Sequence, residues 1–540
     1  MENQAASKTA LTVGVEYEFL FGYLSLKDKP SVGSPIPSDD DERDVGYFGY
    51  PVSDSDEDSD DDQNPEDEDA GPDPVWTPEA DPWNNPNLSL ATLNLTQPPF
   101  LVPATYSGNH QTAQRAQHVV QPIHTKIKTD LTAAGLPAFI GTEDGDGLQC
   151  KWWKTHWTVK DDISVRRRSF RGPWGVRHRF EGVEVTSPIL RIVDDDDTTS
   201  ALDVIGRAAA AIKRANRVSI NHTCGFHVHV GIVSPDPAGD PAGGWTDVAV
   251  KKLVTLIWLL DGRLEGLVRP FRHDPERSRW CEPVTMKSGL ACEDIHEAEY
   301  VLTDGFRVWM PRVVRDVVEG SNSSPVNVDG LVALCFRVAY IWSYATDEKL
   351  AGDVSKAADG TGFGMSISLK PLWRCLRTAR SEMDMKPTVK FRKLEGTLNP
   401  ATATAWTHLC LRIVQLAADT TPAEFQSLVA ALLSFYRPPP GTTTVFPPSQ
   451  TPSSPRTESD EEHEEEEMRA TTGALAVLQG GVLTAGHVEH LREKIMGGHG
   501  HFTCCDHSDP GYIDGSGSAD AFRRDATGDY VPVRCVVHGV

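Results

Sequence analysis

The chain has 540 residues, of which 39% are hydrophobic, and its formal net charge is −25. This length exceeds that of one ordinary core, so it predicts about two to four compact units or one large domain with long insertions. Two acidic runs carry 23 of the 25 net negative charges: residues 39–69, with sixteen acids and one arginine, and residues 458–467, with eight acids. The rest of the chain is nearly neutral, which argues against a dedicated nucleic-acid binder with a concentrated basic face.

The sequence gives no sign of a membrane or secreted protein. No stretch approaches the ~18 apolar residues of a membrane span, and the first residues, MENQAASKTALTVGVEYEF, lack the pattern of a secretory signal. The ten cysteines are mostly isolated within apolar runs, which fits buried thiols better than a disulfide framework. We therefore expect a cytoplasmic or nuclear chain that is not secreted and has no membrane partner.

The predicted organisation is one catalytic domain with a long insertion. Residues 1–38 hold its first strand, and residues 39–105 form a disordered acidic insertion, because so polar a segment cannot bury enough apolar surface to order itself. Residues 106–436 complete the domain. Residues 437–470 form a Pro-rich and acidic linker, and residues 471–540 contain a helix and a His/Cys-rich tail. A protein partner for the acidic runs stays an open alternative.

Apolar periodicity predicts an α+β fold. The predicted strands are residues 11–21, 137–140, 157–165, 179–190, 219–232, 364–372 and 388–398. The predicted helices are residues 110–134, 198–218, 247–268, 304–319, 330–345, 401–419, 422–436 and 473–496. Several strands have one apolar and one polar face, which indicates a curved, mainly antiparallel sheet packed on helices through one face.

The first strand carries two carboxylates on one face. In LTVGVEYEF, alternation places Val13, Val15 and Tyr17 on one side of the sheet and Glu16 and Glu18 on the other. Two carboxylates at this spacing repel each other unless a cation lies between them. For this strand alone, a solvent-exposed sheet face explains the pattern better than a metal site.

The pattern recurs, which favours a site. Alternation gives three further strands a polar face, with the side chains Lys160, Asp162 and Ser164; Glu184 and Thr186; and His227 and His229. Two histidines on one strand face beside glycines fit metal or phosphate ligation better than a packed core. A fifth segment, TVKFRKLEGTLNP, adds Arg392, which suits phosphate or carboxylate oxygens, or alternatively a buried ion pair with Glu395. Such a face is suited to divalent metal ions that bridge a polyphosphate.

These segments together resemble a known family. The set GVEYEF, WTVKDDIS, FEGVEVTSPIL, CGFHVHVG, RSRWCEP and KFRKLEGTLNP is similar to the fungal-type amidoligase family of the carboxylate-amine ligase superfamily, which is related to glutamine synthetase and glutamate-cysteine ligase. The resemblance covers most of residues 11–436. It implies a glutamine-synthetase-like catalytic fold that uses ATP and Mg²⁺ or Mn²⁺ to turn a carboxylate, on a small molecule or a peptide, into an acyl phosphate that an amine attacks.

The resemblance also implies roles for individual residues. The implied metal ligands are Glu16, Glu18, Glu184 and His227. His229 would lie near the nucleotide phosphates, as would the cations Lys160 and Lys390, and Arg392 would steady the transferred phosphoryl group. Asp162 and Ser164 match the D-x-S strand of the family and would orient the amine.

One departure from the family pattern concerns Lys390. Relatives carry an acid two residues before the arginine, and that acid is a metal ligand, whereas this chain has a lysine, which cannot bind Mg²⁺ as an ammonium. The family also tends to place histidine where this chain has Leu394. An active ligase therefore stands beside two alternatives, a degenerate fold that binds a nucleotide or a partner, and a zinc hydrolase built on His227 and His229.

The tail GGHGHFTCCDHSD carries zinc-competent side chains. It lacks the two separated ligand pairs of a zinc finger, so a flexible tail is the favoured interpretation over a metal site.

Overall fold

The computed structural model describes the following residues of the chain: 8–25, 100–102, 119–141, 154–162, 164–165, 168–171, 177–216, 218–220, 223–234, 244–264, 267–268, 281–293, 303–320, 330–356, 364–377, 387–434, 513–514, 522–524 and 530–532.

Twelve of the described strands form one mixed, mostly antiparallel open sheet. Its main path, in spatial order, is β10 (Ile367–Ser368), β11 (Thr388–Phe391), β9 (Phe226–Ile232), β1 (Leu11–Ser25), β6 (Arg177–Thr186), β4 (Trp157–Asp161) and β3 (Ala138–Ile140). Five short strands add to this path: β2 (Phe100–Val102), β5 (Arg168–Arg171), β7 (Leu190–Ile192), β8 (Val218–Ile220) and β12 (Ile513–Asp514). A separate hairpin joins β13 (Phe522–Arg524) and β14 (Tyr530–Pro532).

Strand β1 is the centre of the sheet, and its sequence explains why. Val13, Val15, Tyr17 and Phe19 alternate along it and are each at most 1% exposed, so this face of the strand forms the core. β6 pairs with it on one side, and β7, β8 and β9 pair with it antiparallel at other positions. Strand alternation then turns Glu16 and Glu18 to the opposite face.

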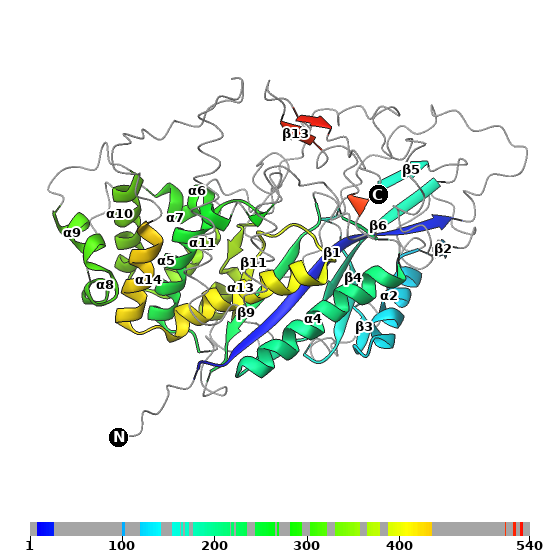
Figure 1. The fold of residues 1–540 in the computed structure, drawn as a ribbon, viewed down its shortest axis with the longest axis horizontal. Helices are drawn as coiled ribbons and strands as arrows, with labels where there is room; N and C mark the ends of the chain where they lie inside the picture. The colour runs from blue at the N-terminus through cyan, green and yellow to red at the C-terminus, as the bar shows by residue number, and fades with distance from the viewer. Residues whose placement is uncertain are drawn as a thin grey trace, which may run out of the picture.

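Three helices cover the apolar face. They are α2 (Gln121–Ala133), α4 (Asp195–Ala215) and α13 (Pro400–Asp419), and Figure 1 shows α13 crossing in front of β1 and α4 running alongside it. Asp194 caps α4 by accepting a hydrogen bond from the Asp197 backbone N–H, and Asn399 caps α13 in the same way. The Tyr17 hydroxyl reaches through the core and donates to the Ile205 carbonyl of α4 at 2.9 Å. The helix layer is therefore fixed to the same strand that carries the two glutamates.

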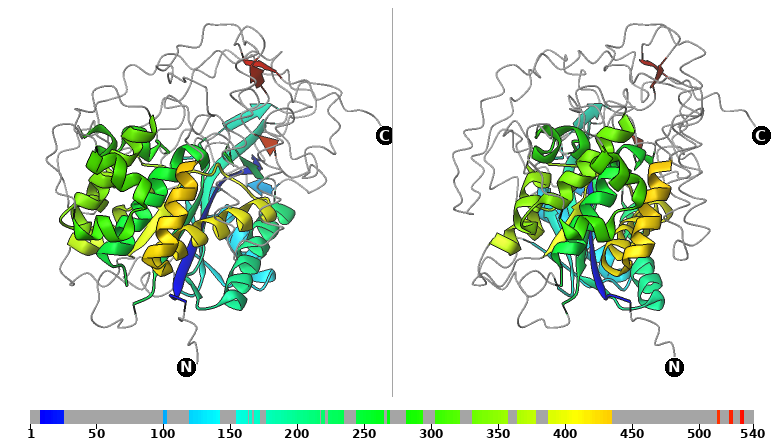
Figure 2. Two further views of the ribbon diagram at one scale, coloured as in Figure 1. Left: turned by 60° about the vertical axis from the view of Figure 1, so that its left-hand side comes forward. Right: turned by 90° about the vertical axis from the view of Figure 1, so that its left-hand side faces the viewer.

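A second group of helices stands beside the sheet, next to β9 and β11 (Figures 1 and 2). It contains α5 (Asp247–Leu264), α6 (Val284–Lys287), α7 (Gly289–Cys292), α8 (Asp304–Trp309), α9 (Arg312–Gly320), α10 (Gly330–Ser343), α11 (Asp347–Ser355), α12 (Lys370–Arg377) and α14 (Pro422–Ser434). Helix α5 is buried over most of its length, and Thr246 caps it by accepting from the Ala249 N–H. No described helix combines the length and the apolar composition needed to cross a membrane.

The α+β fold with a mostly antiparallel sheet confirms the prediction, and the six described cysteines are free thiols, five of them buried. Several predicted elements differ. The strands expected at 157–165 and 388–398 end at Asp161 and Phe391, and those expected at 179–190 and 219–232 are each divided in two, into β6 and β7 and into β8 and β9. The helix expected at 304–319 is two helices, because Pro311 forces Met310 into an extended conformation. The strand expected at 364–372 ends at Ser368, and α12 begins at Lys370 with Pro371 in its first turn, where a missing N–H costs nothing.

Two further predictions concern the insertion and the tail. Residues 100–102, which were assigned to the acidic insertion, form β2 and pair in parallel with Tyr23–Ser25. The C-terminal region contains β12, and this strand pairs with β8, so part of the predicted tail joins the sheet. The acidic runs, the linker 437–470, the helix expected at 473–496 and the zinc-competent side chains of the tail lie outside the described residues.

Candidate active site on the polar face of the sheet

Strands β1 and β9 bring the two glutamates and the two histidines together. Glu16 is paired with His227 and Gly14 with His229 in the antiparallel register. Phe226, Val228 and Val230 are buried on the apolar face, so both imidazoles point to the polar face. The alternation of the sequence is therefore what places four ionisable side chains side by side.

Glu16 is the most heavily hydrogen-bonded carboxylate of this face. Its Oε2 atom lies 2.9 Å from His227 Nδ1 and 2.7 Å from Lys390 Nζ, and its Oε1 atom lies 2.9 Å from His229 Nε2. Burial alone would raise the pKa of Glu16, but the charges of Lys390 and His229 and the hydrogen bonds from both imidazoles hold this pKa well below its usual range. Glu16 is therefore an ionised carboxylate whose charge is already balanced.

Glu18 lies at the centre of a second set of carboxylates. Its register partner on β6 is Glu184, and Glu184 is in turn the partner of Lys160 on β4. The Gly225 backbone N–H donates to Glu18 Oε2 at 2.7 Å, which holds the side chain in place. Burial, followed by repulsion from Asp162 and Glu184, raises the pKa of Glu18 well above its usual range. Burial and repulsion from Glu16 likewise raise the pKa of Glu184.

Lys160 and Thr186 hold Glu184 from the edge of this set. Lys160 Nζ lies 3.1 Å from Glu184 Oε1, and the Thr186 hydroxyl donates to the same oxygen at 2.9 Å. The Lys160 side chain is 46% exposed, so its ammonium reaches solvent while it pairs with the buried carboxylate. The sequence prediction that Lys160 lies at the site is consistent with this position.

His227 is neutral in this environment. Burial, with the positive charge of Lys390, lowers the pKa of His227 well below its usual range. Its Nδ1 atom faces Glu16 Oε2 at 2.9 Å and Glu18 Oε1 at 3.2 Å, and a carboxylate can only accept a hydrogen bond. We therefore assign the single proton of this ring to Nδ1, which leaves the lone pair on Nε2.

Lys390 and Arg392 come from β11 and its C-terminal end. Lys390 is the register partner of His229, and the neighbouring Phe391 is fully buried, so Lys390 projects onto the polar face. The backbone N–H of Arg392 donates to the Ser366 carbonyl at 2.7 Å, and the guanidinium charge contributes to the lowered pKa of His227. The next residue, Lys393, is 1% exposed and anchors this segment to α5 through Asp261, at 2.7 Å from Nζ to Oδ1.

Asp162 and Ser164 follow β4 and form a tight turn. Asp162 Oδ1 accepts hydrogen bonds from the Ser164 N–H at 2.8 Å and from the Ser164 hydroxyl at 2.6 Å. Sequence reasoning gave Asp162 a role with the amine substrate and missed its position beside Glu18 and Glu184. The strand pattern contained a signal for this position. Lys160 and Glu184 are paired polar residues on adjacent strands, and Asp162 lies two residues after Lys160, which by strand alternation is the same face.

A glycine makes the approach of Asp162 possible. A Cβ atom at Gly182 would lie 2.6 Å from the Asp162 carbonyl oxygen and 2.9 Å from Val165 Cβ, so a side chain at this position forces the turn away from β6. We expect Gly182→Ala to weaken Mn²⁺ binding by about 10–100-fold, the effect of losing a residue that positions a metal ligand. Isothermal titration calorimetry with Mn²⁺ measures this.

Gly262→Ala is the matched control for Gly182→Ala, because no atom lies within 4 Å of a Cβ at Gly262 in α5. The control is expected to stabilise the chain by about 0.5–1 kcal/mol and to leave Mn²⁺ affinity unchanged. Equal Mn²⁺ affinity in Gly182→Ala and the parent would contradict the positioning of Asp162.

Two groups of three side chains on this face have ligand atoms within 4.8 Å of one another, namely Glu16, Glu18 and His227, and Glu18, Asp162 and Glu184. Oxygen-rich sets of this kind suit Mg²⁺ and Mn²⁺. Within the described ranges, neither group contains both histidines, although the zinc-hydrolase alternative would place His227 and His229 on one ion. The carboxylates of the second group raise one another's pKa, so a divalent cation there would relieve their repulsion.

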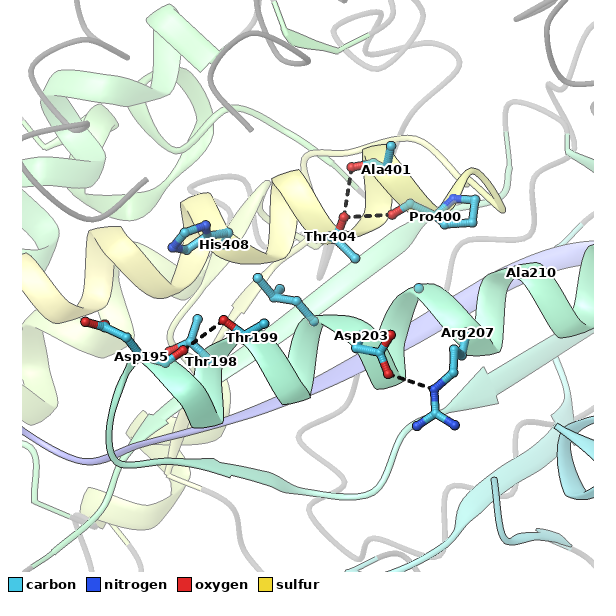
Figure 3. Close-up of a pocket in the computed structure, with 12 residues that line it drawn as sticks. Asp195, Thr198, Thr199, Asp203, Arg207, Ala210, Pro400, Ala401, Thr404 and His408 are labelled. Atoms are coloured by element: carbon cyan, nitrogen blue, oxygen red, sulfur yellow. Dashed lines mark hydrogen bonds and ion pairs between the residues drawn. The ribbon is translucent and has the colours of Figure 1, made fainter. Parts of the chain in front are cut away.

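A separate groove lies on the other side of the sheet. Its volume is about 710 Å³, and it is lined by α4 and α13, including Asp203, Arg207 and Thr404 (Figure 3). Tyr17, on the apolar face of β1, contacts α4, whereas Glu16 and Glu18 point away from these helices. The groove is therefore in the helix layer and is not part of the carboxylate cluster.

The polar face can be compared with known proteins. Residues 105–288 match the sequence model of a family described as "Putative amidoligase enzyme". This span contains β4, β6 and β9, and thus Asp162, Glu184 and both histidines, whereas Glu16 and Lys390 lie outside it. No curated protein and no solved structure matches the chain. The match supports an amidoligase family, a class of ligases that join a carboxylate to an amine.

Proposed function

We propose that this chain is an ATP-dependent amidoligase that activates a carboxylate as an acyl phosphate and transfers the acyl group to an amine. The observation that carries the proposal is the single polar face on which four carboxylates, two imidazoles and two lysines from β1, β4, β6, β9 and β11 meet. A face of this composition is suited to holding a metal-bound polyphosphate and much less to binding an apolar ligand. The resemblance and the mostly antiparallel sheet support our proposal of a glutamine-synthetase-like catalytic fold.

The donor set fits a divalent cation. Glu16, Glu18, Glu184 and His227 are the proposed ligands, and Asp162 joins them because it lies within the second three-residue group. When bound there, Mg²⁺ or Mn²⁺ would supply positive charge that neutralises the phosphates of ATP. The Gly225 N–H and the Thr186 hydroxyl keep Glu18 and Glu184 in place, so the ligands are organised in advance.

Cationic side chains surround the carboxylates and are proposed to bind the nucleotide. Lys160 lies at one edge and reaches solvent, while His229 and Lys390 lie at the other. Arg392 follows β11 and would hold the transferred phosphoryl group, because a guanidinium matches the geometry of phosphate oxygens. An arrangement of cations on both flanks would orient a polyphosphate across the sheet.

Asp162 and Ser164 are proposed to orient the amine. The Ser164 hydroxyl donates to Asp162 Oδ1, and its own oxygen can still accept a hydrogen bond from an incoming amine, while Asp162 Oδ2 stays available to the metal ion. The substrates are a small-molecule or peptide carboxylate and an amine, and neither a nucleic acid nor a membrane is part of the proposal.

The proposal is tested with carboxylate substrate labelled with ¹⁸O in both oxygens. Screening of carboxylate and amine pairs should find ADP release that rises only when both are present. Transfer of one ¹⁸O atom from the carboxylate to inorganic phosphate is the expected signature of an acyl phosphate. A rate of ATP hydrolysis that does not change when both substrates are added, or zinc that co-purifies with the chain, would contradict the proposal.

One observation favours a second function, that of a catalytically degenerate fold that binds a nucleotide or a partner protein. Lys390 pairs with Glu16 at 2.7 Å and so competes with a metal ion for this ligand. In that case ATP binds to the chain with a measurable affinity, yet no carboxylate and amine pair stimulates ADP release.

A further inference from the structure

We propose that Lys390 is a tethered cation that takes the place of one metal ion on Glu16, so that the chain binds a single divalent ion between Glu18, Asp162 and Glu184. The inference rests on the proposed metal-dependent function and states which carboxylates pair with the lysine and which bind the metal ion. It narrows the five ligands of the proposed function to Glu18, Asp162 and Glu184, because Glu16 and His227, which the resemblance also implies as ligands, are engaged with each other and with Lys390.

The first step concerns Glu16, whose two oxygens are both occupied. Oε2 accepts from Lys390 Nζ at 2.7 Å and from His227 Nδ1 at 2.9 Å, while Oε1 accepts from His229 Nε2 at 2.9 Å. Because a carboxylate only accepts, all three nitrogens are donors toward it. A metal ion on Glu16 would have to displace a buried ammonium, whose side chain is only 12% exposed. Glu16 is thus satisfied by protons that the chain itself supplies.

The second step concerns the oxygens that stay available. Asp162 uses Oδ1 to accept both hydrogen bonds of its turn, and Glu184 uses Oε1 to accept from Thr186 and to pair with Lys160. In the part of the chain that the structure describes, Asp162 Oδ2 and Glu184 Oε2 have no hydrogen-bond donor. Glu18 lies between them and belongs to both three-residue groups. The open oxygens therefore lie on the β4 and β6 side of the cluster, away from Lys390.

The third step concerns the positions of the two lysines. Lys390 Nζ lies 2.7 Å from Glu16 Oε2, on a carboxylate of the first three-residue group, whereas Lys160 Nζ contacts Glu184 Oε1 and leaves Oε2 open. A divalent ion in the first group would meet the Lys390 ammonium at short range, and the two positive charges would repel each other. Removal of Lys390 therefore opens a second position, whereas removal of Lys160 does not.

The test is the number of Mn²⁺ ions bound per chain, measured by calorimetric titration and by equilibrium dialysis without ATP or substrates. The parent is expected to bind one ion. Lys390→Met frees Glu16 and Lys390→Glu adds a ligand, and both variants are expected to bind two. Lys160→Met is the matched control, because it removes the other lysine of the cluster, and it is expected to bind one.

Two further variants locate the ion in the parent chain. Glu184→Gln is expected to lose it, whereas Glu16→Gln is expected to keep it with less than about a 10-fold change in affinity, the lower limit for a residue that acts on a metal through another group. Circular dichroism of each variant confirms that it is folded. If Lys390→Met does not fold, the number of ions bound by Lys390→Glu still tests the role of Lys390.

The outcomes separate the inference from the proposed function. Two ions on the parent, one ion on both Lys390 variants, or loss of the ion in Glu16→Gln overturns the role of Lys390 and leaves a metal-dependent ligase standing. No Mn²⁺ on any of the proteins overturns the metal-dependent function itself.

Discussion

Replacing Glu18 with glutamine is expected to weaken Mn²⁺ binding and to lower the ligase rate, each by at least about 100-fold, which exceeds the usual effect of changing a group that only supports a metal ligand. Glu18 is the one residue common to both three-residue donor groups. Glutamine keeps the shape of the side chain, and its carbonyl can still accept from the Gly225 N–H, so the fold is retained. Calorimetric titration and the rate of ADP release with both substrates measure the two losses.

The same variant is expected to raise the melting temperature of the metal-free chain. Burial and repulsion from Asp162 and Glu184 raise the pKa of Glu18, which means that its ionised form destabilises the folded state at neutral pH. Glu181→Gln is the control, because Glu181 is equally buried on β6, contacts the Tyr23 hydroxyl and belongs to neither donor group. Retained metal binding in Glu18→Gln, or an equal loss in Glu181→Gln, would contradict the assigned site.

Replacing Lys393 with methionine is expected to destabilise the fold by about 3–5 kcal/mol, the usual cost of breaking a buried ion pair by removing one partner. Lys393 donates to both Asp261 Oδ1 and the Asp261 carbonyl at 2.7 Å, and both side chains are at most 1% exposed. The variant leaves the carboxylate of Asp261 buried with only the hydroxyls of Thr285 and Ser366 and one backbone N–H. Denaturant titration followed by tryptophan fluorescence measures the change.

The pH dependence of this difference has a definite sign. Burial opposes ionisation of Asp261, but Lys393 and the hydrogen bonds from Thr285 lower its pKa below the usual value of 3.8. A carboxylate with a lowered pKa stabilises the folded chain at pH values above its unfolded pKa of about 3.9. This stabilisation is lost as the pH falls further, through the folded pKa. The difference in the free energy of unfolding between the parent and Lys393→Met should therefore be largest at neutral pH and should decrease on acidification.

Lys8→Met provides the control for Lys393→Met. Lys8 pairs with Asp195 at 2.9 Å, but both side chains are largely exposed, so the expected change is at most about 1 kcal/mol. A loss in Lys393→Met no larger than that in Lys8→Met would mean that the buried pair does not hold β11 in place.

The sequence predicted the central strands well because apolar, buried residues alternate with polar residues along them. In β1 and β9 each second residue is apolar and at most 5% exposed, and this pattern alone separates Glu16 and His227 from the core. Two of the boundaries that failed depend on prolines whose effect is local, Pro311 between α8 and α9 and Pro371 in the first turn of α12. The strand β2 was missed because three residues cannot display a period, and its pairing with β1 comes from tertiary contact.

The site could be predicted as a set of residues but not as a set of contacts. Alternation and resemblance gave Glu16, Glu18, Glu184 and His227, and strand register then determined which of them meet. The Lys390–Glu16 ion pair joins residues 374 positions apart, so no local pattern shows it. The resemblance gave Asp162 a role with the amine, whereas its approach to Glu184 depends on the missing side chain of Gly182, which only the packed structure reveals.

The central position of β1 has a consequence for the synthesis of the protein. The strand leaves the ribosome first, yet the lysine that neutralises Glu16 is translated 374 residues later. At about 5–20 residues per second, this interval is roughly 20–75 s. The two long partners of β1 are made within this interval, because β6 begins at Arg177 and β9 at Phe226. Until both have been made, the apolar strand β1 has open edges, which is the condition under which nascent chains pair with one another. We expect the nascent chain to depend on chaperones until β9 has been made, and Glu16 to stay without its lysine partner until β11 has followed.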